Sequence, residues 1–140
     1  MRNILAPLAG LLLTASALPS MAETYDCSVD EAQSGNNKGI PPRIIVTHKN
    51  DKATVIDGLI QTIVGKPIPA KIDVNNKKRI TFVWTMSQVK GETNNGGGKR
   101  NGNLVYRLTY QKGTGKTTVS MTPVGYQNTF RAKGGCVVTQ

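Results

Sequence analysis

Short segments in which apolar and polar residues alternate recur along this chain, separated by clusters of Gly, Asn, Lys and Pro. The alternation is clearest over residues 79–86, where Ile80, Phe82, Trp84 and Met86 share one parity. A β-strand places successive side chains on opposite faces, so this pattern predicts a strand with one buried face. No segment of the chain shows a sustained helical period. The alternation therefore predicts an all-β fold.

The turn signals divide residues 23–140 into about eight expected strands joined mostly by hairpins. We interpret 62–64 as a continuation of the third strand past a bulge near Gly58, and 91–103 as a flexible loop. This order favours a small antiparallel β-barrel with up-and-down connections, which leaves no exposed sheet edge. A two-sheet β-sandwich with the same strands is the alternative. The expected strands are 25–29, 43–48, 53–60, 71–74, 79–86, 104–111, 116–122 and 129–138.

Two cysteines, Cys27 and Cys136, lie near the two ends of this domain. In an oxidising compartment such a pair indicates a disulfide, and only one pairing exists. The bond would place the first and last strands side by side, which supports a closed barrel. Gly134 and Gly135 precede the second cysteine and predict a bulge or a close backbone approach.

The N-terminal residues 1–22 have the layout of a signal peptide. Arg2 is followed by the mostly apolar run 4–18 and by small residues at Ser20 and Ala22, where a signal peptidase would cleave. The run is short for a membrane span of about 20 residues. We therefore expect cleavage after Ala22, a single β domain over 23–140, and a periplasmic or secreted location.

No catalytic residue, metal ligand or cofactor is predicted from the motifs. Residues 113–118 resemble the end of a phosphate-binding loop, but Tyr110 stands where that motif needs a glycine. His48 is the only histidine, and its place beside a polar turn predicts a surface residue. Among the carboxylates, Asp57 and Asp73 fall within expected strands, where both can point to solvent.

Two groups of side chains are the candidate ligand-binding residues. Aromatic rings on alternating positions could line a barrel that holds one small ligand, although packing of the core is the more ordinary role of such rings. Basic residues dominate from Thr93 onward, where seven lysines and arginines occur without an acidic residue. Such a surface attracts polyanions. The candidates are Trp84, Tyr106, Tyr110, Lys99, Arg100, Arg107, Lys112 and Lys116.

These features favour a non-enzymatic, exported binding or accessory module for an anionic or small amphiphilic ligand, or for a component of the cell envelope. The formal net charge of +10 fits an anionic partner. No motif for specific nucleic-acid recognition is present, and a membrane-spanning barrel would need aromatic girdles that so few aromatic residues cannot supply. A small periplasmic hydrolase and a structural partner of another envelope protein are the alternatives.

Overall fold

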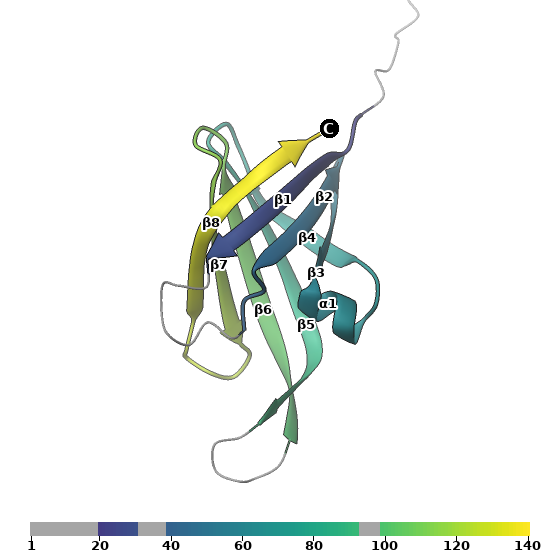
Figure 1. Cartoon of the computed structure of the whole chain (residues 1–140), viewed down its shortest axis with the longest axis vertical. Helices are drawn as coiled ribbons and strands as arrows, with labels where there is room; N and C mark the ends of the chain where they lie inside the picture. The colour runs from purple at the N-terminus through teal and green to yellow at the C-terminus, as the bar shows by residue number, and fades with distance from the viewer. Residues whose placement is uncertain (1–19, 31–38, 93–98) are drawn as a thin grey trace, which may run out of the picture.

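The computed structural model describes residues 20–30, 39–92 and 99–140, which form eight antiparallel strands and one short helix (Figure 1). Each strand is paired with the next in the chain, and β8 is paired with β1, so the sheet closes into a barrel. The elements are β1 (Glu23–Asp30), β2 (Arg43–Lys49), β3 (Lys52–Asp57), α1 (Gly58–Ile63), β4 (Ile68–Asn75), β5 (Arg79–Glu92), β6 (Lys99–Gln111), β7 (Lys116–Pro123) and β8 (Phe130–Thr139).

The closed barrel with up-and-down order is the architecture that the hairpin pattern predicted, and the sandwich alternative is not adopted. Consecutive strands run in opposite directions, so the ends of β1, β3, β5 and β7 share one end of the barrel with α1. The β2–β3, β4–β5 and β6–β7 turns lie at the opposite end, as does the C-terminus (Figure 1). We call these the α1 end and the turn end.

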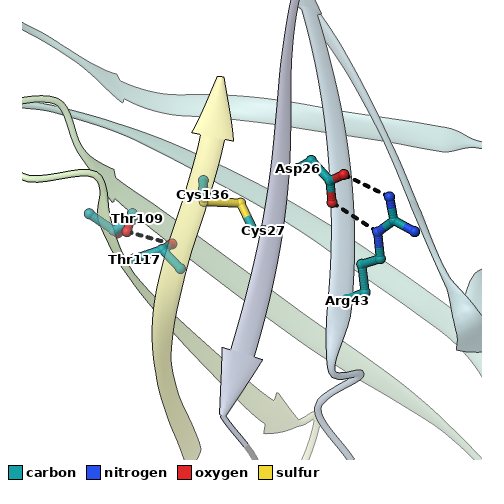
Figure 2. Close-up of a disulfide and its surroundings, with 6 residues drawn as sticks. All are labelled: Asp26, Cys27, Arg43, Thr109, Thr117 and Cys136. Atoms are coloured by element: carbon teal, nitrogen blue, oxygen red, sulfur yellow. Dashed lines mark hydrogen bonds and ion pairs between the residues drawn. A yellow bond between two sulfur atoms is a disulfide. The ribbon is translucent and has the colours of Figure 1, made fainter. Parts of the chain in front are cut away.

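A disulfide between Cys27 and Cys136 crosses the seam between β1 and β8, as predicted (Figure 2). The two residues are direct partners in the antiparallel ladder and are separated by 109 positions in the sequence. Beside the seam, the Arg43 guanidinium donates two hydrogen bonds to the Asp26 carboxylate, at 2.9 and 2.7 Å. Covalent closure and strand pairing therefore act at the same place.

Gly134 allows the seam to close tightly. A Cβ atom at this position would collide with the carbonyl of Ser28 on β1. The close backbone approach expected at the Gly134-Gly135 pair is therefore present. The register irregularities of the barrel lie elsewhere, between Ile72 and Val74 on β4 and between Met86 and Val89 on β5.

The inward-facing side chains of the strands form the core, as the alternation predicted. Ile80, Phe82, Trp84 and Met86 of β5 are all buried. They pair laterally with inward-facing residues of β6, so Phe82 opposes Leu108. Burying such side chains contributes about 1.5–3 kcal/mol each relative to exposure.

Two local predictions were wrong. Residues 62–64 do not continue the third strand, because β3 ends at Asp57 and the chain turns into α1. The Asp57 carboxylate accepts a hydrogen bond from the Ile60 backbone N–H at 2.8 Å, which is a helix N-cap and ends the strand. The segment 91–103 is also not simply a loop, since β5 and β6 remain paired as far as Glu92 and Lys99. Residues 31–38 and 93–98 lie outside the described residues, and the second of these ranges is part of the expected 91–103 loop.

Candidate functional site

The middle of the barrel is packed with large side chains, which decides the place of two candidate residues. Trp84 and Tyr106 are 2% and 0% exposed, and their rings stack with centroids 5.4 Å apart and planes 5° from parallel. The Tyr106 hydroxyl donates a hydrogen bond to the Gly39 carbonyl at 2.6 Å. These two aromatic residues therefore pack the core, and the Tyr106 hydroxyl holds the segment that begins at Gly39 against it.

Tyr110, the third aromatic candidate, lies toward the turn end. Its ring meets that of Tyr25 edge-on at 5.2 Å, and Tyr25 also contacts Phe82 at 5.3 Å. The Tyr25 hydroxyl donates to Glu23 at 2.9 Å. Burial raises the pKa of this hydroxyl, and the hydrogen bond to the Glu23 carboxylate raises it further. The cluster stabilises the turn end and offers no open aromatic surface.

A hollow of about 560 Å³ opens beside α1, and none of its described lining residues was among the predicted ligand residues. Leu59 and Thr62 of α1 form one side of it, and Val89 and Leu104 of the β5–β6 pair form another. We call this hollow the α1 groove; its main lining residues are Ile40, Pro41, Leu59, Thr62, Val89, Lys90 and Leu104. Its volume falls within the range of small-molecule sites.

Three local features build the α1 groove. The Asp57 cap directs the chain away from the barrel wall, so that Ile60 is buried while Leu59 and Thr62 face the hollow. The irregularity between Met86 and Val89 turns β5, and Gln88 there adopts a positive φ of 60°. A second hollow of about 730 Å³ shares Leu59, Val89 and Lys90 with the groove. The apolar surface thus runs around both sides of α1.

Among the described residues that line the α1 groove, Lys90 is the only charged one. It is exposed, whereas Leu59, Val89 and Leu104 are half-buried. On the far side of α1, Ile63 and Val64 are each 42% exposed, although they are large apolar side chains. The α1 groove therefore combines a mainly apolar lining with Lys90 at its edge.

Two buried polar atoms next to this region have no hydrogen-bond partner among the described residues: Asp57 Oδ2 and Trp84 Nε1. Asp57 is 6% exposed, so its strand position did not place it in solvent as expected. Burial raises the pKa of the Asp57 carboxyl, against the lowering effect of the Ile60 and Leu59 backbone N–H groups. Burial also raises the pKa of Tyr106, as does the Asp57 charge to a smaller degree.

The five basic candidates do not form one site. Lys99 and Arg100 begin β6 at the α1 end, opposite Glu92 and Gly91 in the ladder. Lys112 and Lys116 flank the β6–β7 turn at the other end, where the Lys112 ammonium donates to Asn75 at 2.8 Å. About 40 Å of extended chain separates the two pairs along β6.

Arg107 lies between these pairs, on the outer face of β6, where its guanidinium bonds the Asp73 carboxylate at 2.8 Å. It lines a hollow of about 360 Å³ on the outside of β6, β7 and β8. Arg131 and Lys133 line the same hollow but were not among the predicted ligand residues. The alternation along the last strand could have identified both as outward-facing. Each lies an odd number of positions before Cys136, which faces inward, so each points away from the core.

His48 and Glu23 meet at the turn end, 3.4 Å apart between Nδ1 and Oε2. The imidazole Nε2 lies 2.6 Å from the Asn50 carbonyl, and the ring packs on Phe82. The His48 side chain is 13% exposed, so the prediction of a surface histidine was wrong: its β2 position points inward. Both ring nitrogens therefore lie near oxygen atoms of neighbouring residues.

Within residues 20–30, 39–92 and 99–140, no group of three or more His, Cys, Asp or Glu side chains is arranged to hold a metal ion. None of the helical segments described is both long and apolar enough to cross a bilayer. The chain matches no family model, no curated protein and no solved structure. Any functional assignment must therefore come from the geometry itself.

Proposed function

We propose that this protein is an exported, non-enzymatic binding module that holds a small amphiphilic anion in the α1 groove. The observation that carries the proposal is a mainly apolar hollow of about 560 Å³, in which Lys90 is the single charged residue among the described lining residues. A ligand with an apolar body and one anionic group matches both properties. Burial of its methylene groups would supply about 0.8 kcal/mol each, and Lys90 would orient the head group.

The carboxylates of the described residues support a binding role over hydrolysis. Glycoside hydrolysis requires two carboxyl groups that converge on one bond. Asp57 is buried under α1, whereas Asp73 and Asp26 are held by Arg107 and Arg43 on the outer wall. These three carboxylates thus have separate partners or positions, and none of them is among the described residues that line the α1 groove.

Export is part of the proposal. The layout of residues 1–22 supports it, and the Cys27–Cys136 disulfide is compatible with an oxidising compartment outside the cytoplasm. In such a compartment a barrel with a packed interior and an open apolar groove at one end suits the carriage or sensing of amphiphiles released from membranes or taken up from the medium.

Titration calorimetry of residues 23–140 with decanoate, decanol and decyltrimethylammonium tests the proposal. We expect decanoate to bind most tightly and decyltrimethylammonium most weakly. Lys90→Glu should weaken decanoate binding about fivefold, since it replaces an exposed attraction worth up to about 1 kcal/mol by a repulsion. Lys112→Glu, with the same charge change at the turn end, is the matched control and should have little effect.

A steric variant separates the groove from general charge effects. Thr62 is exposed on α1 and lines the groove, so Thr62→Trp should fill the hollow without disturbing the core and should reduce the affinity for decanoate and decanol alike. Equal weakening by Lys90→Glu and Lys112→Glu, together with unchanged binding to Thr62→Trp, would contradict the proposal.

A further inference from the structure

A hollow of about 380 Å³ lies at the turn end, and Glu23 and His48 are among the residues that line it. The two residues are direct partners in the β1–β2 ladder, so their side chains lie on the same face of the sheet. The imidazole Nδ1 stands 3.4 Å from the carboxylate Oε2, and the side chains of His48 and Glu23 are 13% and 38% exposed. The pair is therefore held between two strands and can be reached from solvent.

Neighbouring groups fix the orientation of both side chains. The Nε2 atom of His48 lies 2.6 Å from the Asn50 carbonyl, which can only accept a hydrogen bond, so Nε2 carries a proton and Nδ1 is the nitrogen that faces Glu23. The ring also packs edge-on against Phe82. On the other side of the pair, the Tyr25 hydroxyl donates a hydrogen bond to the Glu23 carboxylate at 2.9 Å.

This arrangement is typical of metal ligands in proteins. A ligating histidine donates its second ring N–H to a carbonyl or carboxylate oxygen, and a ligating carboxylate is itself hydrogen-bonded. Two ligands of a tetrahedral Zn²⁺ ion lie about 3.4 Å apart when each bond is about 2.0–2.2 Å long, which matches the separation of Nδ1 and Oε2. Square-planar Cu²⁺ brings adjacent ligands closer together, and Mg²⁺ and Ca²⁺ prefer oxygen ligands to imidazole.

Cleavage after Ala22 would supply a third ligand at this place. Ser20 and Met21 line the same hollow and would leave with the signal peptide, which would widen access to it. The new N-terminus would be the α-amine of Glu23 itself, beside the carboxylate that faces His48. An α-amine holds its proton less firmly than a lysine side chain does, so a metal ion can displace that proton near neutral pH.

We propose that removal of residues 1–22 completes a Zn²⁺ site at the turn end, with the His48 imidazole, the Glu23 carboxylate and the Glu23 α-amine as ligands. This inference rests on the cleavage that is part of the proposed export. Three protein ligands leave one position of a tetrahedral ion open to water or to an exchangeable ligand. The signal peptidase would therefore create the site only in exported protein.

Calorimetric titration of Zn²⁺ into residues 23–140, prepared with Glu23 as the first residue, tests the site. We expect one ion to bind, and we expect Co²⁺ at the same site to show the intense visible absorption of tetrahedral coordination. Glu23→Ala, His48→Gln and acetylation of the α-amine should each weaken Zn²⁺ binding at least about tenfold. Asp51→Ala, which removes an exposed carboxylate from the β2–β3 turn, is the matched control and should weaken it about twofold at most.

Failure to bind Zn²⁺, or equal losses in Glu23→Ala and Asp51→Ala, would overturn the proposal, because general attraction to surface carboxylates predicts equal losses. Unchanged affinity after acetylation would overturn it as well, since the α-amine would then not be a ligand. Glu23→Ala should bind decanoate as the unaltered protein does, so the α1 groove stands or falls independently of this site. Exported protein that retains Ala22 would show that the complete site does not form in the cell.

Discussion

Reduction of the Cys27–Cys136 disulfide should lower the stability of the barrel without changing its fold. The bond joins residues 109 positions apart, so in the chain-entropy model it restricts the unfolded chain by about 4–5 kcal/mol. In the folded state, the β1–β8 ladder pairs Thr24 through Asp30 with Thr139 through Lys133. These hydrogen bonds keep the seam closed after the sulfurs separate, so the native far-UV spectrum should not change.

Urea unfolding with and without a reductant measures this effect. For a domain of this size, the loss corresponds to a fall of about 2 M in the urea midpoint. The variant Cys27→Ala/Cys136→Ala serves as the control and should unfold at the same urea concentration with or without reductant. Because Cys27 is fully buried, this variant should be less stable than the reduced protein by about 1 kcal/mol.

An unchanged midpoint for protein whose thiols are shown to be reduced would refute the reasoning. It would mean that the bond does not restrict the unfolded chain. A loss of the native spectrum on reduction would instead show that the β1–β8 ladder cannot hold the seam alone.

Three further predictions follow from single residues. Trp84 is 2% exposed, so its fluorescence emission should be blue-shifted and poorly quenched by acrylamide. Emission typical of a tryptophan in water would contradict the inward-facing position of Trp84 on β5. Burial raises the pKa of Asp57, so the folded state binds its proton more tightly, and stability is lost as pH rises from the ordinary aspartate range through the raised pKa. Asp57→Asn should therefore increase the free energy of unfolding more at neutral pH than near pH 3, and an equal change at both would disprove the linkage. The mass of exported protein should correspond to residues 23–140, and a retained Met1 would rule out cleavage after Ala22.

The sequence predicted the barrel because its evidence is repeated in every strand. Side-chain parity along residues such as Ile80, Phe82 and Trp84 determines which face is buried, and a shift of one residue would expose the whole set. The cysteines indicated the pairing of β1 with β8, which no turn connects. Each of these signals can be recognised without knowing any tertiary contact.

The α1 groove could not be predicted in the same way, because its residues come from four separate parts of the chain. Ile40, Leu59, Val89 and Leu104 are ordinary apolar residues in sequence and become neighbours only when the barrel closes. A local signal existed at Asp57, which caps α1 three residues before Ile60. The β-like composition of residues 59–64 concealed this signal, since isoleucine and valine favour strands.

The basic candidates show a second limit of predicting a site from the sequence. Their charge was evident, and the expected strand 104–111 already separated Lys99 from Lys112, which lie at opposite ends of β6 in the structure. Strand register instead groups Arg107 with Arg131 and Lys133, which are more than 20 positions apart in the chain. Clustering in sequence was therefore a poor guide to clustering on the wall of the barrel.

Amide chemical-shift mapping by NMR during a decanoate titration tests the central claim most directly. If the α1 groove binds amphiphilic anions, the largest shifts should occur at Leu59, Thr62, Val89, Lys90 and Leu104, while Lys112 and Lys116 at the turn end remain unchanged. Shifts spread over the outer wall or centred at the turn end would contradict the assignment of the groove as the ligand site.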